Sequence, residues 1–347
     1  MALPSIDGGA AANAAGPGKR HPVEFTADSG EYFRIWIVNL ALTIATLGIY
    51  SAWAKVRKRR YFYGHTRIDG ESFEYRANPV AILKGRLIAV AAIVVFYGVG
   101  YFAPLYQLLL WIPLAILVPW LLVRSLAFNA YNTAYRNVRF RFEGSYKACL
   151  KVVLVYGWLV FTGILYPYLK HRLIRFVAEN HRYGTTRFEI ADFKKPFIGA
   201  YANAFGLGIV LAVVAFGLGA VMAQAKTPYL SFGTVMLFYA GLFLLFAYIR
   251  GRTTNAIWNA VRIGPLSFES SLRARDLVWL YFSNLLAIAF TLGLATPWAA
   301  VRAMRYRASK TTVIASGQLD GFAEGQAQQV SVAGEEVADF FDIDIAL

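Results

Sequence analysis

The sequence predicts an all-α polytopic membrane protein, in which two transmembrane helical hairpins alternate with three helices broken by Gly or Pro. Composition is the first reason: 58% of the 347 residues are hydrophobic and only 16% are charged, whereas an average soluble domain carries about 25% charged residues. The second is a set of long uncharged segments bounded by Lys and Arg, and the third is the regular order in which these segments recur.

Three regions follow from composition. Residues 1–31 are rich in Ala, Gly and Pro and are predicted to be a disordered N-terminal segment without a cleaved signal peptide. Residues 32–314 are predicted to form the membrane domain. Residues 315–347 form an acidic tail with seven acidic residues and no Lys or Arg. Two alternatives stay open for the tail: a disordered, solvating segment, or one that docks on the basic cytoplasmic face of its own protein or on an unknown partner.

The two hairpins are expected at residues 80–125 and 196–250. Residues 87–123 contain no formal charge. At about 1.5 Å per residue they cross a ~30 Å hydrocarbon core twice only as a tight hairpin, and Pro104 supplies its turn. Cations flank the base of each hairpin, so the positive-inside rule places both bases in the cytoplasm.

The three single apolar elements, at residues 35–54, 152–169 and 277–301, are long enough to span. If all three crossed, a strongly basic loop would lie outside in either orientation, against the positive-inside rule. A re-entrant or surface-lying course is therefore favoured over the alternative of seven full spans. The residues that break these elements are Gly48, Gly163, Pro167, Gly293 and Pro297.

An internal repeat relates the elements. A shift of 245 residues superposes "TLGIYSAWAKVRKRRY" on "TLGLATPWAAVRAMRY", and the segment around Gly163 is a weaker third copy. Internal repeats are common in transporter folds. Polar segments such as "HTRIDGESFEY", which contains a type I′ turn signal at Asp69-Gly70, are expected to form short cytoplasmic β-hairpins.

The segment "LGIYSAWAKVRKRRYFYG" (residues 47–64) and the ending "GEEVADFFDIDIAL" closely resemble the YjgN family of bacterial inner-membrane proteins. The resemblance covers nearly the whole chain from Tyr32 onward. It implies a multi-pass protein of the bacterial inner membrane. It implies no catalytic residues, because the family is one of unknown function.

Cations and aromatics beside the broken elements are typical of interfacial anchors that meet anionic phospholipid headgroups. Two interpretations stay open: a topology signal and membrane anchor, or a specific site for an anionic lipid or an anionic solute. The candidate headgroup contacts are Lys55, Arg57, Arg60, Arg172, Arg175, Arg302 and Arg305.

Four amides lie among apolar residues as two equivalent pairs, Asn39 with Asn284 and Asn132 with Asn255. Buried amides in a bilayer usually bond neighbouring helices, and the functional alternative is a polar path at the repeat interface.

The sequence favours a transporter or permease for a small solute. The alternative is a non-catalytic membrane-organising or anionic-lipid-binding protein. No nucleophile-and-base pair or phosphate-binding loop indicates an enzyme, and no cofactor is expected. The single Cys149 and four scattered His residues predict no metal site. The cations flank apolar segments instead of forming a separate domain, which argues against nucleic acid as a partner.

Overall fold

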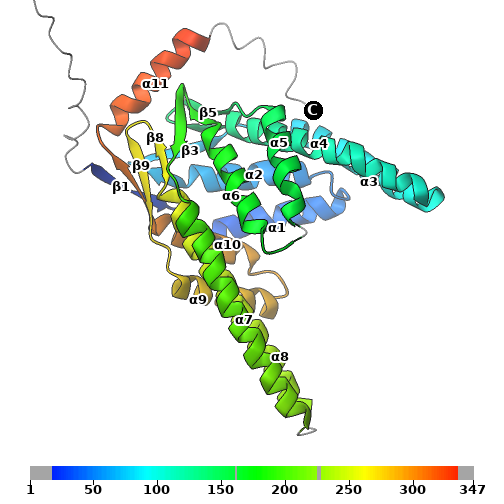
Figure 1. Cartoon of the computed structure of the whole chain (residues 1–347). Coiled ribbons are helices and arrows are strands. Elements are labelled where there is room, and N and C mark those ends of the chain that lie inside the picture. Colours follow the sequence, from blue (N-terminus) through cyan, green and yellow to red (C-terminus); the bar gives the residue numbers. More distant parts are fainter. Residues whose placement is uncertain (1–17, 161, 225–227, 335–347) are drawn as a thin grey trace, which may run out of the picture.

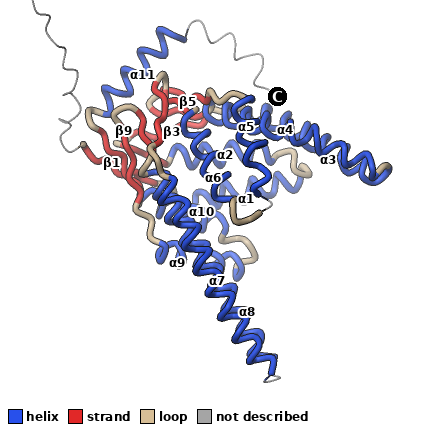
Figure 2. Tube along the Cα trace, in the orientation of Figure 1, coloured by secondary structure: helices blue, strands red, loops and turns tan. Residues whose placement is uncertain are grey.

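A computed structural model describes residues 18–160, 162–224 and 228–334 of the chain. In this part of the chain, ten antiparallel strands close into a barrel, and pairs of helices leave the barrel and return to it (Figures 1 and 2). The strands are β1 Lys19–Phe25, β2 Thr66–Ile68, β3 Glu71–Tyr75, β4 Thr133–Tyr135, β5 Val138–Phe142, β6 His181–Tyr183, β7 Thr186–Ile190, β8 Val261–Ile263, β9 Leu266–Ser270 and β10 Thr311–Ala315. The helices are α1 Ser29–Ala45, α2 Ser51–Gly64, α3 Pro79–Phe102, α4 Pro104–Tyr131, α5 Tyr146–Tyr156, the 3₁₀ turn η1 Gly157–Val160, α6 Tyr166–Glu179, α7 Lys194–Gln224, α8 Pro228–Trp258, α9 Ala274–Phe290, α10 Thr296–Ser309 and α11 Leu319–Gly334.

The prediction of an all-α fold with separate β-hairpins was wrong, because the hairpins join edge to edge into one closed barrel. A two-stranded hairpin of three and five residues cannot bury its apolar face alone, and closure leaves no unpaired edge. The partners lie far apart in the chain, so local periodicity does not reveal the pairing.

Each helix pair is inserted between two strands that pair with each other. β1 pairs with β2 across α1/α2, β3 with β4 across α3/α4, and β5 with β6 across α5/α6. β7 pairs with β8 across α7/α8, and β9 with β10 across α9/α10. Contact between β1 and β10 closes the ring. The barrel therefore holds the base of every helix pair.

Two-residue loops join the strands within each hairpin. Ile68 pairs with Glu71 across Asp69-Gly70, whose φ values of 53° and 79° are both in the left-handed region. This geometry matches the right-handed twist of the flanking strands.

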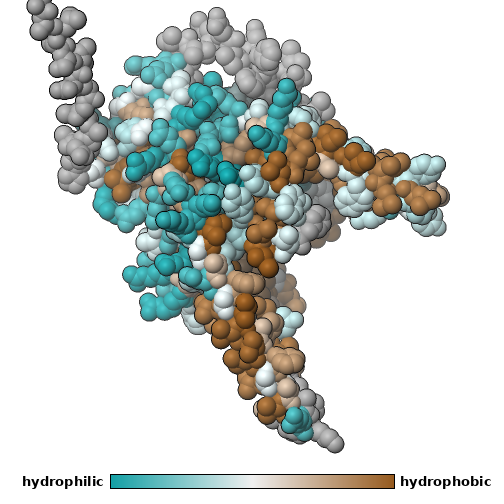
Figure 3. All heavy atoms as spheres, in the orientation of Figure 1, coloured by the Kyte–Doolittle hydropathy of each residue, from teal (hydrophilic) through white to brown (hydrophobic). Residues whose placement is uncertain are grey.

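In the part of the chain that the structure describes, four helices, α3, α4, α7 and α8, are long and apolar enough to cross a membrane. Their large apolar side chains point outward, and Figure 3 shows hydrophobic surface along the two projecting hairpins and hydrophilic surface around the barrel. Such a surface is unfavourable in water and suits contact with lipid.

The broken elements are pairs of helices joined by a tight turn. Gly48 and Gly293 occupy equivalent turns with φ of 94° and 95°, and Gly163 has φ of 63°. Leu47 and Leu292 project from the turns and are 96% and 94% exposed. The tips of these pairs therefore present apolar residues away from the barrel.

Both terminal regions contribute to the barrel. Within the segment predicted to be disordered (residues 1–31), β1 pairs with β2 and β10 and α1 begins at Ser29, so that prediction was wrong for residues 19–31. Residues 1–17 lie outside the described residues, as do residues 335–347 of the acidic tail. The described part of the tail includes α11, which lies across one end of the barrel (Figure 1).

Candidate functional site

Aromatic side chains fill the barrel. The central residue of four five-residue strands is a phenylalanine, and all four line the interior. Successive side chains of a strand point to opposite faces, so the charged neighbours of each phenylalanine point outward. These phenylalanines are Phe73, Phe140, Phe188 and Phe268.

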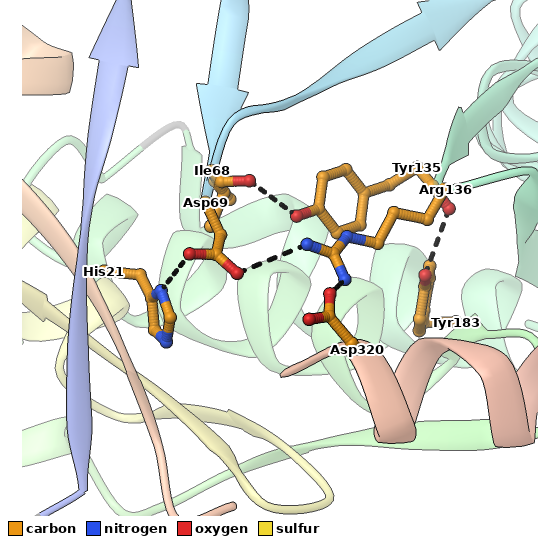
Figure 4. Close-up of polar contacts among 7 residues, drawn as sticks. All are labelled: His21, Ile68, Asp69, Tyr135, Arg136, Tyr183 and Asp320. Carbon is orange, nitrogen blue, oxygen red and sulfur yellow. Dashed lines mark hydrogen bonds and ion pairs between the residues drawn. The ribbon is translucent and has the colours of Figure 1, made fainter. Parts of the chain in front are cut away.

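Two buried tyrosines complete the interior. The Tyr135 hydroxyl donates to the Ile68 carbonyl oxygen at 2.8 Å, and the Tyr183 hydroxyl donates to the Tyr135 carbonyl oxygen at 3.0 Å (Figure 4). Burial raises the pKa of both phenols. Because both hydroxyls are bonded to the barrel backbone, the remaining interior surface is apolar, and it encloses a small cavity of about 150 Å³.

Helix α11 closes one end of this cavity with Leu319, Phe322 and Ala323. A chain of charged groups holds the helix in place (Figure 4). Arg136, in the β4–β5 turn, pairs with Asp320 of α11 and, at 3.3 Å, with Asp69 of the β2–β3 turn.

The chain of charged groups extends to His21 in β1. A second set of hydrogen bonds, made by Gln326, attaches α11 further along its length. Asp69 also accepts from His21 Nδ1 at 2.9 Å. In α11, Gln326 Oε1 accepts from the backbone amides of Thr185 and Thr186 at 2.8 and 3.1 Å. Helix α11 thereby bonds directly to the β4–β5 and β6–β7 turns, and Arg136 links it to the β2–β3 turn.

A larger cavity of about 450 Å³ lies between the barrel and α8, α9 and α10. Four side chains line both cavities, so the two adjoin. They are Ile68, Phe73, Trp258 and Phe268. We call the larger cavity the barrel mouth. Its volume lies within the range of about 300–1,000 Å³ that is usual for small-molecule sites.

The barrel mouth is apolar with cationic edges. Leu272, Leu277 and Met304 are among its lining residues, and Arg250 and Arg307 are exposed at its border. The Arg307 guanidinium lies 3.4 Å from the Tyr281 hydroxyl, and neither arginine pairs with an acidic group among the described residues. This arrangement can accommodate an apolar chain and stabilise a negative charge at its end.

Asn132 and Asn255 do not line a path through the apolar helices. Asn132 ends α4, where its side chain donates to the Phe128 carbonyl. Asn255 bonds Ser270 Oγ and both backbone groups of Leu272, each at 2.9 Å. Both amides lie at the barrel ends of their helices, where they fix local backbone.

Asn39 and Asn284 are both buried in the broken pairs, but their surroundings differ. Asn284 accepts from Arg302 at 3.0 Å and donates to the Ala299 carbonyl at 3.3 Å. Asn39 Oδ1 is buried and has no partner among the described residues.

Most of the cations predicted to meet headgroups are engaged within the protein. Arg60 bonds the carbonyls of Tyr75 and Ala77, and Arg305 bonds that of Ala27, so these two attach α2 and α10 to the barrel. Three others are bonded locally: Arg172 contacts Tyr168, Arg175 pairs with Glu179, and Arg302 contacts Ser283 and Asn284. Lys55 and Arg57 are exposed and have no hydrogen-bond or ion-pair partner among the described residues.

The predicted breaks lie in or beside the turns. Gly48, Gly163 and Gly293 have positive φ there. Pro167 and Pro297 lie in the first turns of α6 and α10, where a missing amide hydrogen costs no helical bond.

The residues of the barrel mouth were not predicted from the sequence, although one signal was present. A phenylalanine recurs at the centre of "ESFEY", "VRFRF", "TRFEI" and "LSFES". Such a recurrence indicates a shared interior. Among the described residues, no group of three or more His, Cys, Asp or Glu side chains is arranged to hold a metal ion.

Comparison with known proteins decides the family. A family model described as a bacterial protein of unknown function (DUF898) matches residues 20–340. The chain belongs to this family. A DUF898 relative in Salmonella typhimurium, named inner membrane protein YjgN, is 24% identical over 355 residues, which cover 86% of this chain and 89% of the relative. The predicted resemblance to the YjgN family is thereby confirmed.

A second protein of that name, in Escherichia coli O157:H7, is 32% identical over 136 residues, 37% of this chain and 32% of the relative. The chain thus spans about a third of the length of that relative. No solved structure matches the chain. Together with the four apolar helices, the relatives identify this DUF898 chain as an integral membrane protein.

Proposed function

We propose that this chain is a non-catalytic lipid-binding protein of the bacterial inner membrane, and that its barrel mouth takes up a single-chain anionic amphiphile such as a fatty acid. The observation that carries the proposal is a cavity of about 450 Å³ that is lined mainly by apolar side chains, bordered by Arg250 and Arg307, and adjacent to the apolar barrel interior. Burial of an alkyl chain contributes about 0.8 kcal/mol per methylene, and the guanidinium groups would neutralise the carboxylate.

The location of the mouth supports entry from the membrane. Arg250, Thr254 and Trp258 belong to the end of α8 that reaches the barrel, so the mouth lies at the base of an apolar hairpin. The other end of the interior is covered by α11. An amphiphile would therefore enter beside α8, with its chain directed toward the interior phenylalanines.

Solute transport has less support. Asn132 and Asn255, half of the polar path suggested by the sequence, are bonded to backbone at the barrel ends of α4 and α8. The surfaces of the apolar helices expose large hydrophobic residues. The internal repeat is accounted for by a helix pair inserted between paired strands, an arrangement that a lipid-binding barrel uses equally well.

A blocked mouth tests the proposal. Thr254 lines the mouth, so Thr254→Trp should fill it and weaken binding of a fluorescent fatty acid to the purified full chain in detergent by about tenfold or more, or about 1.4 kcal/mol. Val213→Trp adds the same bulk to an exposed position on α7 and should leave binding unchanged. Equal affinity of the native protein and Thr254→Trp would refute the barrel mouth as the site.

We infer further that α3/α4 and α7/α8 cross the membrane and that the barrel, the basic loops and the acidic tail are cytoplasmic. The cations at the barrel ends of the hairpins, including Lys84, Arg124 and Lys194, support this orientation. In a Cys149→Ser background, Tyr101→Cys at the distal end of α3 should react with an impermeant thiol reagent in spheroplasts, and Glu71→Cys in the barrel should not. Labelling of position 71 would reverse the orientation.

A further inference from the structure

A second pocket lies away from the barrel, where the first and last broken pairs meet. Helix α1 packs against both α2 and α10, and the space between them has a volume of about 330 Å³. Its polar and aromatic lining includes Trp36, Asn39, Thr43, Lys55, Lys58 and Thr296. Because residues from both ends of the chain contribute, the pocket is part of the folded structure and not a feature of one helix.

Asn39 is the unusual member of this lining. The residue is 93% buried, since only 7% of its surface remains exposed, and its Oδ1 has no hydrogen-bond partner among the residues that the structure describes. Buried polar atoms are almost always paired, so an unpaired acceptor calls for an explanation. The equivalent oxygen of Asn284 receives a bond from Arg302. A donor supplied by a ligand would satisfy Asn39.

The pocket also carries positive charge without a counterion. Lys55 and Lys58 both line it and are both exposed, and neither pairs with an acidic group in the described part of the chain. Partial burial of its ammonium group against the pocket, and then the charges of Arg59 and Arg86, hold the pKa of Lys55 below its ordinary value. An anion placed here would be attracted by several cations at once.

We propose that this pocket binds the headgroup of an anionic phospholipid that carries free hydroxyls, as phosphatidylglycerol does. The ammonium groups of Lys55 and Lys58 meet the phosphate, and a headgroup hydroxyl donates to Asn39 Oδ1. The exposed apolar side chains of Ile44 and Leu47 at the tip of the same helix pair would lie among acyl chains, so the ligand is a membrane lipid and not a free phosphate ester. This site is separate from the barrel mouth and does not depend on the proposed function.

Native mass spectrometry of the full chain in detergent tests the proposal with two probes. Phosphatidylglycerol and phosphatidylmethanol have the same charge, but only the first carries headgroup hydroxyls. One hydrogen bond to a buried unpaired acceptor should favour phosphatidylglycerol by about tenfold. Asn39→Leu should abolish this preference, whereas the matched variant Asn284→Leu should retain it.

Charge is tested separately. The double variant Lys55→Gln/Lys58→Gln should bind both lipids about tenfold more weakly. The control double variant Lys147→Gln/Lys151→Gln removes two cations from α5 and should bind both lipids as the native protein does. Equal binding of the two lipids by the native protein would overturn the proposal whether or not the variants fold. Displacement of phosphatidylglycerol by free glycerol phosphate at comparable concentration would overturn the assignment to a lipid. Because Thr254→Trp blocks only the mouth, failure of one site is distinguishable from failure of the other.

Discussion

The first and last broken helix pairs, α1/α2 and α9/α10, share one turn and differ in one amide. The φ values are 50° and 94° at Leu47 and Gly48 of the first turn, and 50° and 95° at Leu292 and Gly293 of the last. In both turns a threonine hydroxyl donates to the carbonyl four residues earlier at 2.7 Å and accepts from the amide four residues later at 2.9 Å. The backbone of the two pairs is therefore built by the same local interactions.

The amides show what the two copies do differently. Asn284 is held by Arg302, whereas Asn39 Oδ1 is left unpaired beside two lysines. The residue equivalent to Arg302 in the first pair, Arg57, is exposed. One copy thus uses its buried amide to stabilise the helix pair, and the other leaves it available to a ligand. The duplicated sequence encodes the turn, and the residues around the turn decide its use.

The largest expected effect is a difference in stability between variants of the two buried amides, Asn284 and Asn39. Asn284→Leu leaves the Arg302 guanidinium without one partner and should lower the free energy of unfolding by about 1–3 kcal/mol. Asn39→Leu removes an acceptor that has no partner, so stability should not fall. Denaturant unfolding in detergent measures both, and a greater loss in Asn39→Leu would break the comparison.

The shared turn predicts equal effects at the two glycines. Gly48 and Gly293 have positive φ, and a Cβ at either position would meet no atom within 4 Å. Alanine would therefore introduce backbone strain alone, at about 1–2 kcal/mol per site. Thermal unfolding of Gly48→Ala and Gly293→Ala should show matching shifts, and Gly217→Ala, within α7, serves as a control without strain. Clearly unequal shifts would mean that the turns are not equivalent.

The middle helix pair, α5/α6, differs from the other two in that its stability should depend on pH. In the register that aligns Gly163 with Gly293, the buried His171 stands where Val56 and Val301 stand in the other pairs. Burial lowers the pKa of His171 below its ordinary value of 6.5. The unfolded chain then binds the proton more readily, so stability is full above about pH 6.5 and is lost as pH falls toward the folded-state pKa.

His171→Val should reduce this loss of stability at acidic pH, as followed by unfolding at a series of pH values. Burial also lowers the pKa of His181. This residue should account for part of the loss of stability that remains in His171→Val. An unchanged pH dependence in His171→Val would contradict the assignment of a neutral buried His171.

The sequence predicted the local features better than their assembly. Charge-free segments and Gly-Pro breaks are local signals. Helices α3, α4, α7 and α8 overlap the two expected hairpins, although α4 and α8 continue past the predicted ends at residues 125 and 250. The barrel was missed because strands of three to seven residues carry little periodicity, and because five of its ten pairings join strands separated by a helix pair. Among the site residues, cations that bond the protein backbone and cations that do not look alike in sequence. Arg60, which bonds the barrel backbone, and Arg57, which has no hydrogen-bond partner among the described residues, were therefore grouped together.

The most direct test of the central contrast is the stabilisation that phosphatidylglycerol gives to each variant. A ligand that binds only the folded state raises the free energy of unfolding by an amount that grows with the ratio of its concentration to its Kd. The thermal midpoint of the native protein and of Asn284→Leu should rise when phosphatidylglycerol replaces a zwitterionic lipid in the micelle, and that of Asn39→Leu should rise clearly less. An equal rise in all three proteins would contradict the assignment of Asn39 to ligand binding and Asn284 to support.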